Sequence, residues 1–101
     1  MVVGKLMISF AGFSYPEHKA TIACSHVLSG DPVLLFVHDD DGDLHFMCGA
    51  SGHAVDDYSL VDLSHLSEHI RSMPDVPFVQ VGYAAERSSV GAPWSVISAS
   101  D

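Results

Sequence analysis

Basic residues are scarce in this sequence, in which four Lys and Arg side chains stand against thirteen Asp and Glu. The formal net charge at pH 7 is −9, so the surface repels phosphate backbones and anionic lipid headgroups. Nucleic acids and membrane surfaces are therefore excluded as expected partners. The charge imbalance favours a cationic partner, and we expect a basic protein.

Cysteine is also scarce, because the chain has only Cys24 and Cys48. Two thiols are too few for the disulfide framework of a small secreted domain, although a single bridge stays open. No apolar run approaches the ~20 residues that span a bilayer. The apolar segment after Lys5 is short for a signal peptide and lacks an A-x-A cleavage pattern, so we expect a cytoplasmic protein.

The residues that are present suffice for one compact core. The chain has 101 residues, of which 48% are hydrophobic and 17% charged, and these values are typical of a single globular domain. No repeat, low-complexity tract or linker divides the sequence. We therefore expect one domain over residues 1–101 and exclude a disordered chain.

Two apolar runs flank an acidic turn and give the clearest local pattern. "VLLFVH" (33–38) precedes "DDDGD", and "LHFMC" (44–48) follows it, which predicts a β-hairpin. A register in which His38 pairs with Leu44 directs alternate residues of both strands, among them Phe36, to one face. Because the opposite face is also apolar, we expect this hairpin to be central in a sheet and covered on both sides.

Further strands and one helix are expected around the hairpin. A helix is predicted from about Leu63 to Ser72, where Met73-Pro74 ends it. The expected fold class is α+β, with a mainly antiparallel sheet and this one principal helix. The additional strands are predicted at Leu6 to Phe10, Ala20 to Leu28, Tyr58 to Leu63 and, interrupted near Gly82, Val76 to Arg87.

The segment "HLSEH" (65–69) matches H-x-x-E-H, an inverted zinc-protease signature. On a helix, Leu63 begins an apolar stripe, whereas His65, Glu68 and His69 fall on the opposite face, toward water. A catalytic zinc requires a walled cavity that such a face does not supply. We interpret the motif as a chance match and predict no catalytic residues.

A second candidate metal set consists of two cysteines and two histidines. Residues i and i+2 share one face of a strand, so a strand through residue 26 would present a thiol and an imidazole together. Two Cys and two His satisfy tetrahedral zinc, but C-x-H and C-x4-H are not established zinc spacings and free Cys is often buried. Unrelated buried thiols, structural zinc and a disulfide remain the alternatives for Cys24, His26, Cys48 and His53.

The acidic turn begins like an EF-hand calcium loop but does not continue as one. Gly42 stands at the fourth position of such a loop instead of the sixth, and Ala50 replaces the bidentate Glu of the twelfth. We interpret the segment as a hairpin turn and as an anionic contact surface that steers a basic partner. Its expected contact residues are Asp39, Asp40, Asp41, Asp43, Asp56 and Asp57.

Four short motifs, in this order and spacing, resemble a known bacterial family: "ACSHVL" (23–28), "HFMCG" (45–49), "DLSHL" (62–66) and "GYAAER" (82–87). The family was first described as a domain of unknown function and later as predicted immunity proteins of polymorphic toxin systems. The resemblance covers about residues 20–97 and implies a small α+β domain that binds and occludes a toxin. The family's Trp before the Phe is missing here.

These observations lead to a first hypothesis of a non-enzymatic protein-binding module of the immunity-protein type. A zinc-stabilised small domain with Cys/His ligands is the first alternative. The second alternative is a homodimer paired through the strand at Leu6 to Phe10, because residues 1–18 lie outside the family resemblance.

Overall fold

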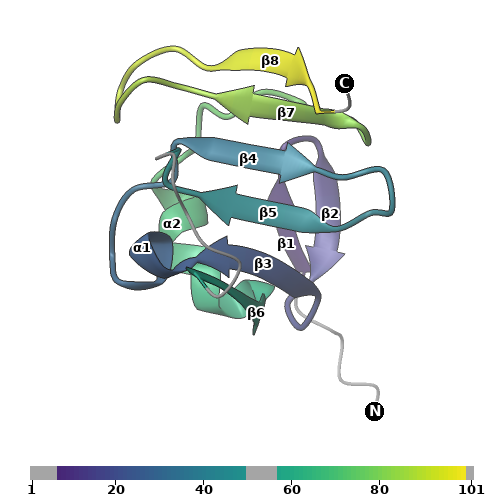
Figure 1. Ribbon diagram of the computed structural model, residues 1–101. Coiled ribbons are helices and arrows are strands. Elements are labelled where there is room, and N and C mark those ends of the chain that lie inside the picture. The colour runs from purple at the N-terminus through teal and green to yellow at the C-terminus, as the bar shows by residue number, and fades with distance from the viewer. Residues whose placement is uncertain (1–6, 50–56, 100–101) are drawn as a thin grey trace.

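The computed structural model of the protein describes residues 7–49 and 57–99 (Figure 1). Its fold is α+β, and a six-stranded, mostly antiparallel sheet forms one layer. Only β3 and β5 run parallel among the described neighbouring strands of this sheet. In spatial order the strands are β6 (Tyr58–Asp62), β3 (Ala20–Cys24), β5 (Leu44–Met47), β4 (Leu35–His38), β7 (Tyr83–Glu86) and β8 (Ser95–Ser98).

The acidic turn joins β4 and β5 in the register that the sequence predicts. His38 lies opposite Leu44, and Phe36 lies opposite Phe46. All four side chains point into the core, where His38 is 3% exposed and the others are fully buried. A shift of β5 by one residue would turn Phe46 away from the core and place His45 or Met47 opposite Phe36. Burial of the two phenylalanines therefore disfavours that shift and fixes the register.

The opposite face of the same two strands was expected to be covered. Leu35, Val37 and Met47 are half-buried there, and in the part of the chain that the structure describes no helix or strand packs over them. The structure shows no cover from the described residues, and the expectation that the hairpin is covered on both sides stays a prediction. The sheet has one core face, and we call the other one the outer face.

A two-stranded hairpin of β1 (Met7–Phe10) and β2 (Phe13–Pro16) packs on the core face. The sequence predicts a strand at residues 6–10 but only a break after it, so β2 is a correction. Ala11 and Gly12 have φ angles of 55° and 91°, as a two-residue primed turn requires. A Cβ on Gly12 would overlap the ring of Phe78, so glycine is required there.

Aromatic rings join this hairpin to the sheet. The ring of Phe10 stands edge-on to Phe36 with centroids 4.6 Å apart and lies 5.4 Å from Phe46. Phe13 contacts His38 edge-on at 5.0 Å and stacks on Phe78 at 5.3 Å. The N-terminal segment from Met7 onward is therefore part of the core of its own chain.

The predicted helix is present as η2 (Leu63–Leu66), a 3-10 turn, followed directly by α2 (Ser67–Arg71). Leu63 and Leu66 are fully buried under the sheet. None of the helices in the described ranges is long and apolar enough to cross a membrane.

Two strand predictions are wrong in extent. The strand predicted at residues 20–28 ends at Cys24, because α1 (Ser25–Leu28) begins there. The strand predicted from Val76 begins only at Tyr83. The segment before β7 contacts the turn between β1 and β2 instead of forming a strand, since the N–H of Val79 donates to Ala11 O at 3.0 Å.

Candidate functional site

The parallel pair β3 and β5 brings both cysteines to one edge of the sheet. Parallel strands end at the same edge, and Ala23 lies beside Phe46 in this pair. Cys24 ends β3 and Cys48 directly follows β5. The chain turns into α1 immediately after Cys24, and this turn places His26 over the same edge.

The three side chains meet closely enough to share a metal ion. The Sγ atom of Cys48 lies 3.5 Å from Nδ1 of His26. The candidate ligand atoms of Cys24, His26 and Cys48 all lie within 4.8 Å of one another. The two cysteines are not joined in a disulfide. Three of the four residues of the candidate zinc set are thus brought together, and the fourth, His53, lies outside the described residues.

The geometric reason for this meeting differs from the predicted one. The i, i+2 argument placed Cys24 and His26 on one strand face, but His26 belongs to α1. Its backbone carbonyl accepts hydrogen bonds from the N–H groups of Ser29, at 3.2 Å, and Asp31, at 2.9 Å. These bonds fix the short helix and so fix the position of the imidazole.

A hollow of about 360 Å³ adjoins the Cys–His cluster. Cys24 is fully buried, Cys48 is half-buried and His26 is exposed, so the cluster runs from the core to the surface. Two of the three candidate donor residues, His26 and Cys48, line the hollow. The described residues that line the hollow are His26, Asp31, Pro32, Leu34 and Cys48.

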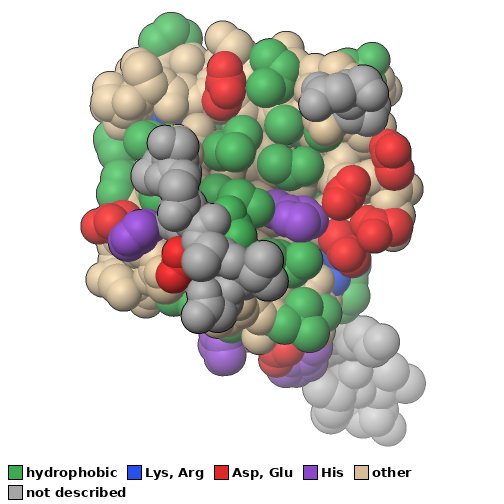
Figure 2. Space-filling view, viewed as in Figure 1, with side chains coloured by type: hydrophobic (Ala, Val, Ile, Leu, Met, Phe, Trp, Pro, Cys, Tyr) green, Lys and Arg blue, Asp and Glu red, His purple; other side chains and the backbone are tan. Residues whose placement is uncertain are grey.

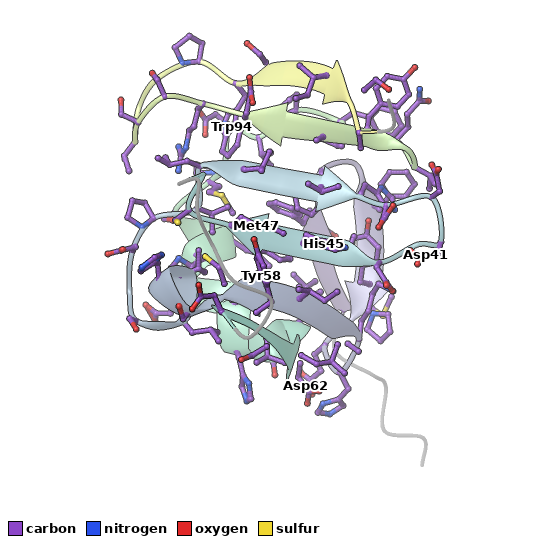
Figure 3. The ribbon with its side chains drawn as sticks, viewed as in Figure 1. Asp41, His45, Met47, Tyr58, Asp62 and Trp94 are labelled. Carbon is purple, nitrogen blue, oxygen red and sulfur yellow. The ribbon has the colours of Figure 1, made fainter. Side chains whose placement is uncertain are left out.

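The acidic turn lies at the other end of the sheet. The N–H of Asp39 donates to Asp43 O and that of Gly42 donates to Asp39 O, both at 2.9 Å. The Oδ1 atom of Asp41 accepts the N–H of Asp43 at 3.0 Å. The turn is thus ordered by its own backbone, and Asp40 and Asp41 stay exposed (Figure 3).

The structure does not bring Asp57 to this turn. Strand β6 is antiparallel to β3, so Asp57, which precedes Tyr58, lies near the end of β3 at Cys24. The turn 39–43 lies at the start of β5, at the opposite end of the sheet. Asp62 ends β6 and lies at the same end as the turn. Asp56 is outside the described residues.

An apolar row crosses the outer face between the two edges of the sheet (Figure 2). Leu60 and Ile97, on the edge strands, are 71% and 40% exposed. This surface was not predicted from the sequence, because an apolar alternate face indicates cover in most sheets. Strand registers define the row, which consists of Leu60, Ile22, His45, Val37, Ala84 and Ile97.

His45 connects this row to the acidic turn. Its Nε2 atom lies 3.4 Å from Oδ2 of Asp39. The distance suits an ion pair when the imidazole is protonated, but Nε2 has no hydrogen-bond partner among the described residues. His45, the second residue of "LHFMC", was the one sequence feature that pointed to a half-open face.

The H-x-x-E-H segment forms no metal centre among the described residues. His65 and Glu68 are exposed, and Glu68 pairs with Arg71 at 3.1 Å. His69 is half-buried instead of facing water, and its Nε2 donates to Val27 O at 2.9 Å. The motif therefore contributes a surface ion pair and a contact between α2 and α1.

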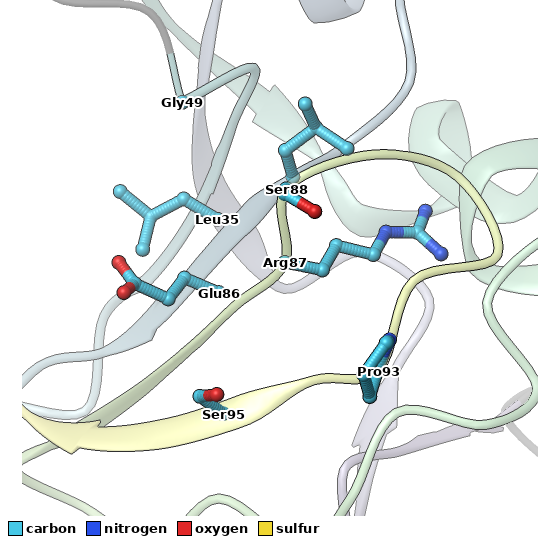
Figure 4. Close-up of a pocket in the computed structure, with 8 residues that line it drawn as sticks. Leu35, Gly49, Glu86, Arg87, Ser88, Pro93 and Ser95 are labelled. Atoms are coloured by element: carbon cyan, nitrogen blue, oxygen red, sulfur yellow. The ribbon is translucent and has the colours of Figure 1, made fainter.

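A second hollow, of about 470 Å³, lies beside the strands β7 and β8 (Figure 4). Arg87 lines it but is held by the fold, since Nε and Nη2 donate to Val33 O at 3.3 and 3.0 Å. Its guanidinium also stacks over Trp94 at 4.4 Å from the ring centroid. It points away from Glu86 (Figure 4). This arginine stabilises the end of the sheet, and we assign it no ligand.

No protein-family model matches this sequence, and neither a curated protein nor a solved structure matches it. The function has to be inferred from the residues themselves.

Proposed function

We propose that the protein is a non-enzymatic binding module of the immunity-protein type, which binds a basic protein through the outer face of its sheet. The observation that carries the proposal is the largely apolar row on this face, with the acidic turn 39–43 beside its middle, next to His45. The resemblance of residues 20–97 to predicted immunity proteins supports the same class.

The composition of the face suits a protein interface. Interfaces combine an apolar centre that loses water with a polar rim that stays accessible. Leu60, Val37 and Ile97 supply apolar area in the row, and the exposed Asp40 and Asp41 supply charge beside its middle. Exposed apolar side chains gathered on one surface are typical of contact sites.

Charge favours a basic partner over a second copy of the chain. Two copies docked by this face would each contribute a surface of a protein with net charge −9, and the acidic turns would repel each other. A basic partner gains from the same charges, chiefly through faster encounter. The aspartates therefore select the partner, and the apolar row retains it.

The test separates these two contributions. A partner is captured from the native host, identified and purified, and its association with the protein is followed by stopped flow at several salt concentrations. We expect Asp41→Asn to slow association several-fold and to reduce its salt dependence. We expect Leu60→Ser to raise the dissociation rate with little change in association.

Matched controls are available on other surfaces. Glu68→Gln removes one charge from α2, where the carboxylate is exposed and forms an ion pair within the helix. Val90→Ser removes an apolar side chain that is 62% exposed outside the row. If Asp41→Asn and Leu60→Ser leave the kinetics as unchanged as these controls do, the outer face is not the binding surface.

A further inference from the structure

We propose that Cys24, His26 and Cys48 bind one zinc ion, which fastens α1 to the edge of the sheet where β3 and β5 end. This site is separate from the proposed protein-binding row and does not depend on it.

The separations of the donor atoms match a tetrahedral site. With Zn–S of about 2.3 Å and Zn–N of about 2.0 Å, a thiolate sulfur and an imidazole nitrogen on one tetrahedral zinc lie about 3.5 Å apart. The observed separation between Cys48 Sγ and His26 Nδ1 is 3.5 Å. Two sulfurs on one zinc lie about 3.8 Å apart. No separation in the set exceeds 4.8 Å, so the donors need to approach one another by only about 1 Å to reach the tetrahedral distances.

The donor types select the metal. Thiolate and imidazole ligands together favour zinc, whereas calcium and magnesium require oxygen ligands. The three residues supply two sulfurs and one nitrogen. The hollow that His26 and Cys48 line leaves room for a fourth ligand, and Asp31 is among its described lining residues. Water or a further ligand completes the coordination there.

The backbone around the donors is already fixed, which lowers the cost of assembling the site. Cys24 is paired to Tyr58 across β3 and β6 and is fully buried. His26 is held by the two hydrogen bonds that its carbonyl accepts from Ser29 and Asp31. A metal ion bound to a prepared site stabilises the fold that presents it. An α1 of only four residues lacks the length to be stable alone, so it gains most from such a link.

The assignment also implies proton release. Zinc binds thiolates and a neutral imidazole, so the two thiols lose their protons when the ion binds. Metal affinity should therefore fall as the pH is lowered. If the thiol and the imidazole only contact each other and bind no metal, no pH-dependent metal affinity is expected.

The experiment uses the full chain in its reduced form, freed of metal, with Co²⁺ as a spectroscopic probe that Zn²⁺ displaces. We expect one Co²⁺ per chain, with the intense visible absorption of a tetrahedral site and a sulfur-to-metal charge-transfer band. Because loss of even an outer partner of a zinc site weakens binding about 10- to 100-fold, His26→Ala and Cys48→Ser should each weaken it more than about tenfold. His65→Ala, which changes an exposed histidine elsewhere, is the matched control.

Cys24→Ser alters a fully buried residue and is expected to perturb folding, so His26→Ala and Cys48→Ser carry the test. Circular dichroism confirms that both variants are folded before titration. Absence of the tetrahedral spectrum in the reduced wild type would overturn the proposal. Equal binding by wild type, His26→Ala and Cys48→Ser would do so as well, because the ion would then lie elsewhere.

Discussion

The ring nitrogen Nδ1 of His38 donates a hydrogen bond to the carbonyl oxygen of Val79, and the two atoms lie 2.9 Å apart. The N–H of Val79 in turn donates to Ala11 O, in the turn between β1 and β2. The carbonyl of His38 accepts the N–H of Gly82 at 2.7 Å. A buried histidine on β4 thus holds the segment before β7 and, through it, the N-terminal hairpin.

We expect His38→Phe to lower the free energy of unfolding by about 1–3 kcal/mol. The ring stays apolar and aromatic, but the buried carbonyl of Val79 loses its partner, and an unpaired buried acceptor costs about that amount. Urea denaturation followed by circular dichroism gives the value. His65→Ala serves as the control, because that side chain is exposed and its loss should change stability by less than about 0.5 kcal/mol. Equal midpoints for the two variants would contradict a structural role for His38.

In contrast to the imidazole of His38, the hydroxyl of Tyr15 is not expected to stabilise the fold. Its hydroxyl is buried and has no hydrogen-bond partner among the described residues. Since a buried hydroxyl without a partner costs about 1–3 kcal/mol, Tyr15→Phe should leave the protein as stable as the wild type or make it more stable. Tyr83→Phe, at an exposed position, is the control for removal of a hydroxyl. A loss of more than about 1 kcal/mol in Tyr15→Phe alone would show that the hydroxyl is bonded.

The burial of the Tyr15 hydroxyl should also make the stability of the protein depend on pH in the alkaline range. Desolvation raises the pKa of Tyr15 above the usual value of 10.0. Above that pH the unfolded chain loses the tyrosine proton while the folded chain keeps it, so stability falls as the pH rises. Below it both states are protonated and this group gives no pH dependence. Denaturation midpoints from pH 9 upward should therefore decline less steeply in Tyr15→Phe than in the wild type.

Phe10 tests whether the N-terminal hairpin belongs to the core. The side chain is 5% exposed and contacts two other buried rings, so Phe10→Ala should cost about 3–5 kcal/mol. Met7→Ala, on the same strand but 54% exposed, should cost less than about 1 kcal/mol. Thermal unfolding compares the two variants. Similar melting temperatures would mean that β1 docks only loosely and is available for pairing between chains.

Local rules predicted the elements whose stability is local. The acidic turn and the alternation around Phe36 determined the register of β4 and β5, since a shift by one residue would expose an aromatic ring. The position of the helix followed from Leu63 and Pro74. These predictions needed only neighbours in the sequence.

The features that were not predicted depend on pairing between strands that lie far apart in the sequence. β3 runs parallel to β5 across a long stretch of chain, and nothing in residues 20–24 specifies that partner. The pairing with β6 ends at Cys24, so α1 begins where a strand had been predicted. The Cys–His cluster depends on both facts. The sequence supplied the residues of the candidate site, but the tertiary fold determined which of them meet.

His69 provides the last test, because it joins the H-x-x-E-H segment to the proposed zinc site. Its Nε2 donates to the carbonyl of Val27 in α1, the helix that carries His26. That carbonyl also accepts the N–H of Gly30 at 3.0 Å, so it keeps a partner when the imidazole is removed. His69→Ala should therefore cost only about 0.5–1.5 kcal/mol of stability. It should also weaken Co²⁺ binding slightly, because α1 is held less firmly, whereas His65→Ala should change neither quantity. A loss of Co²⁺ binding in His69→Ala as large as that in His26→Ala would instead assign the metal to His69.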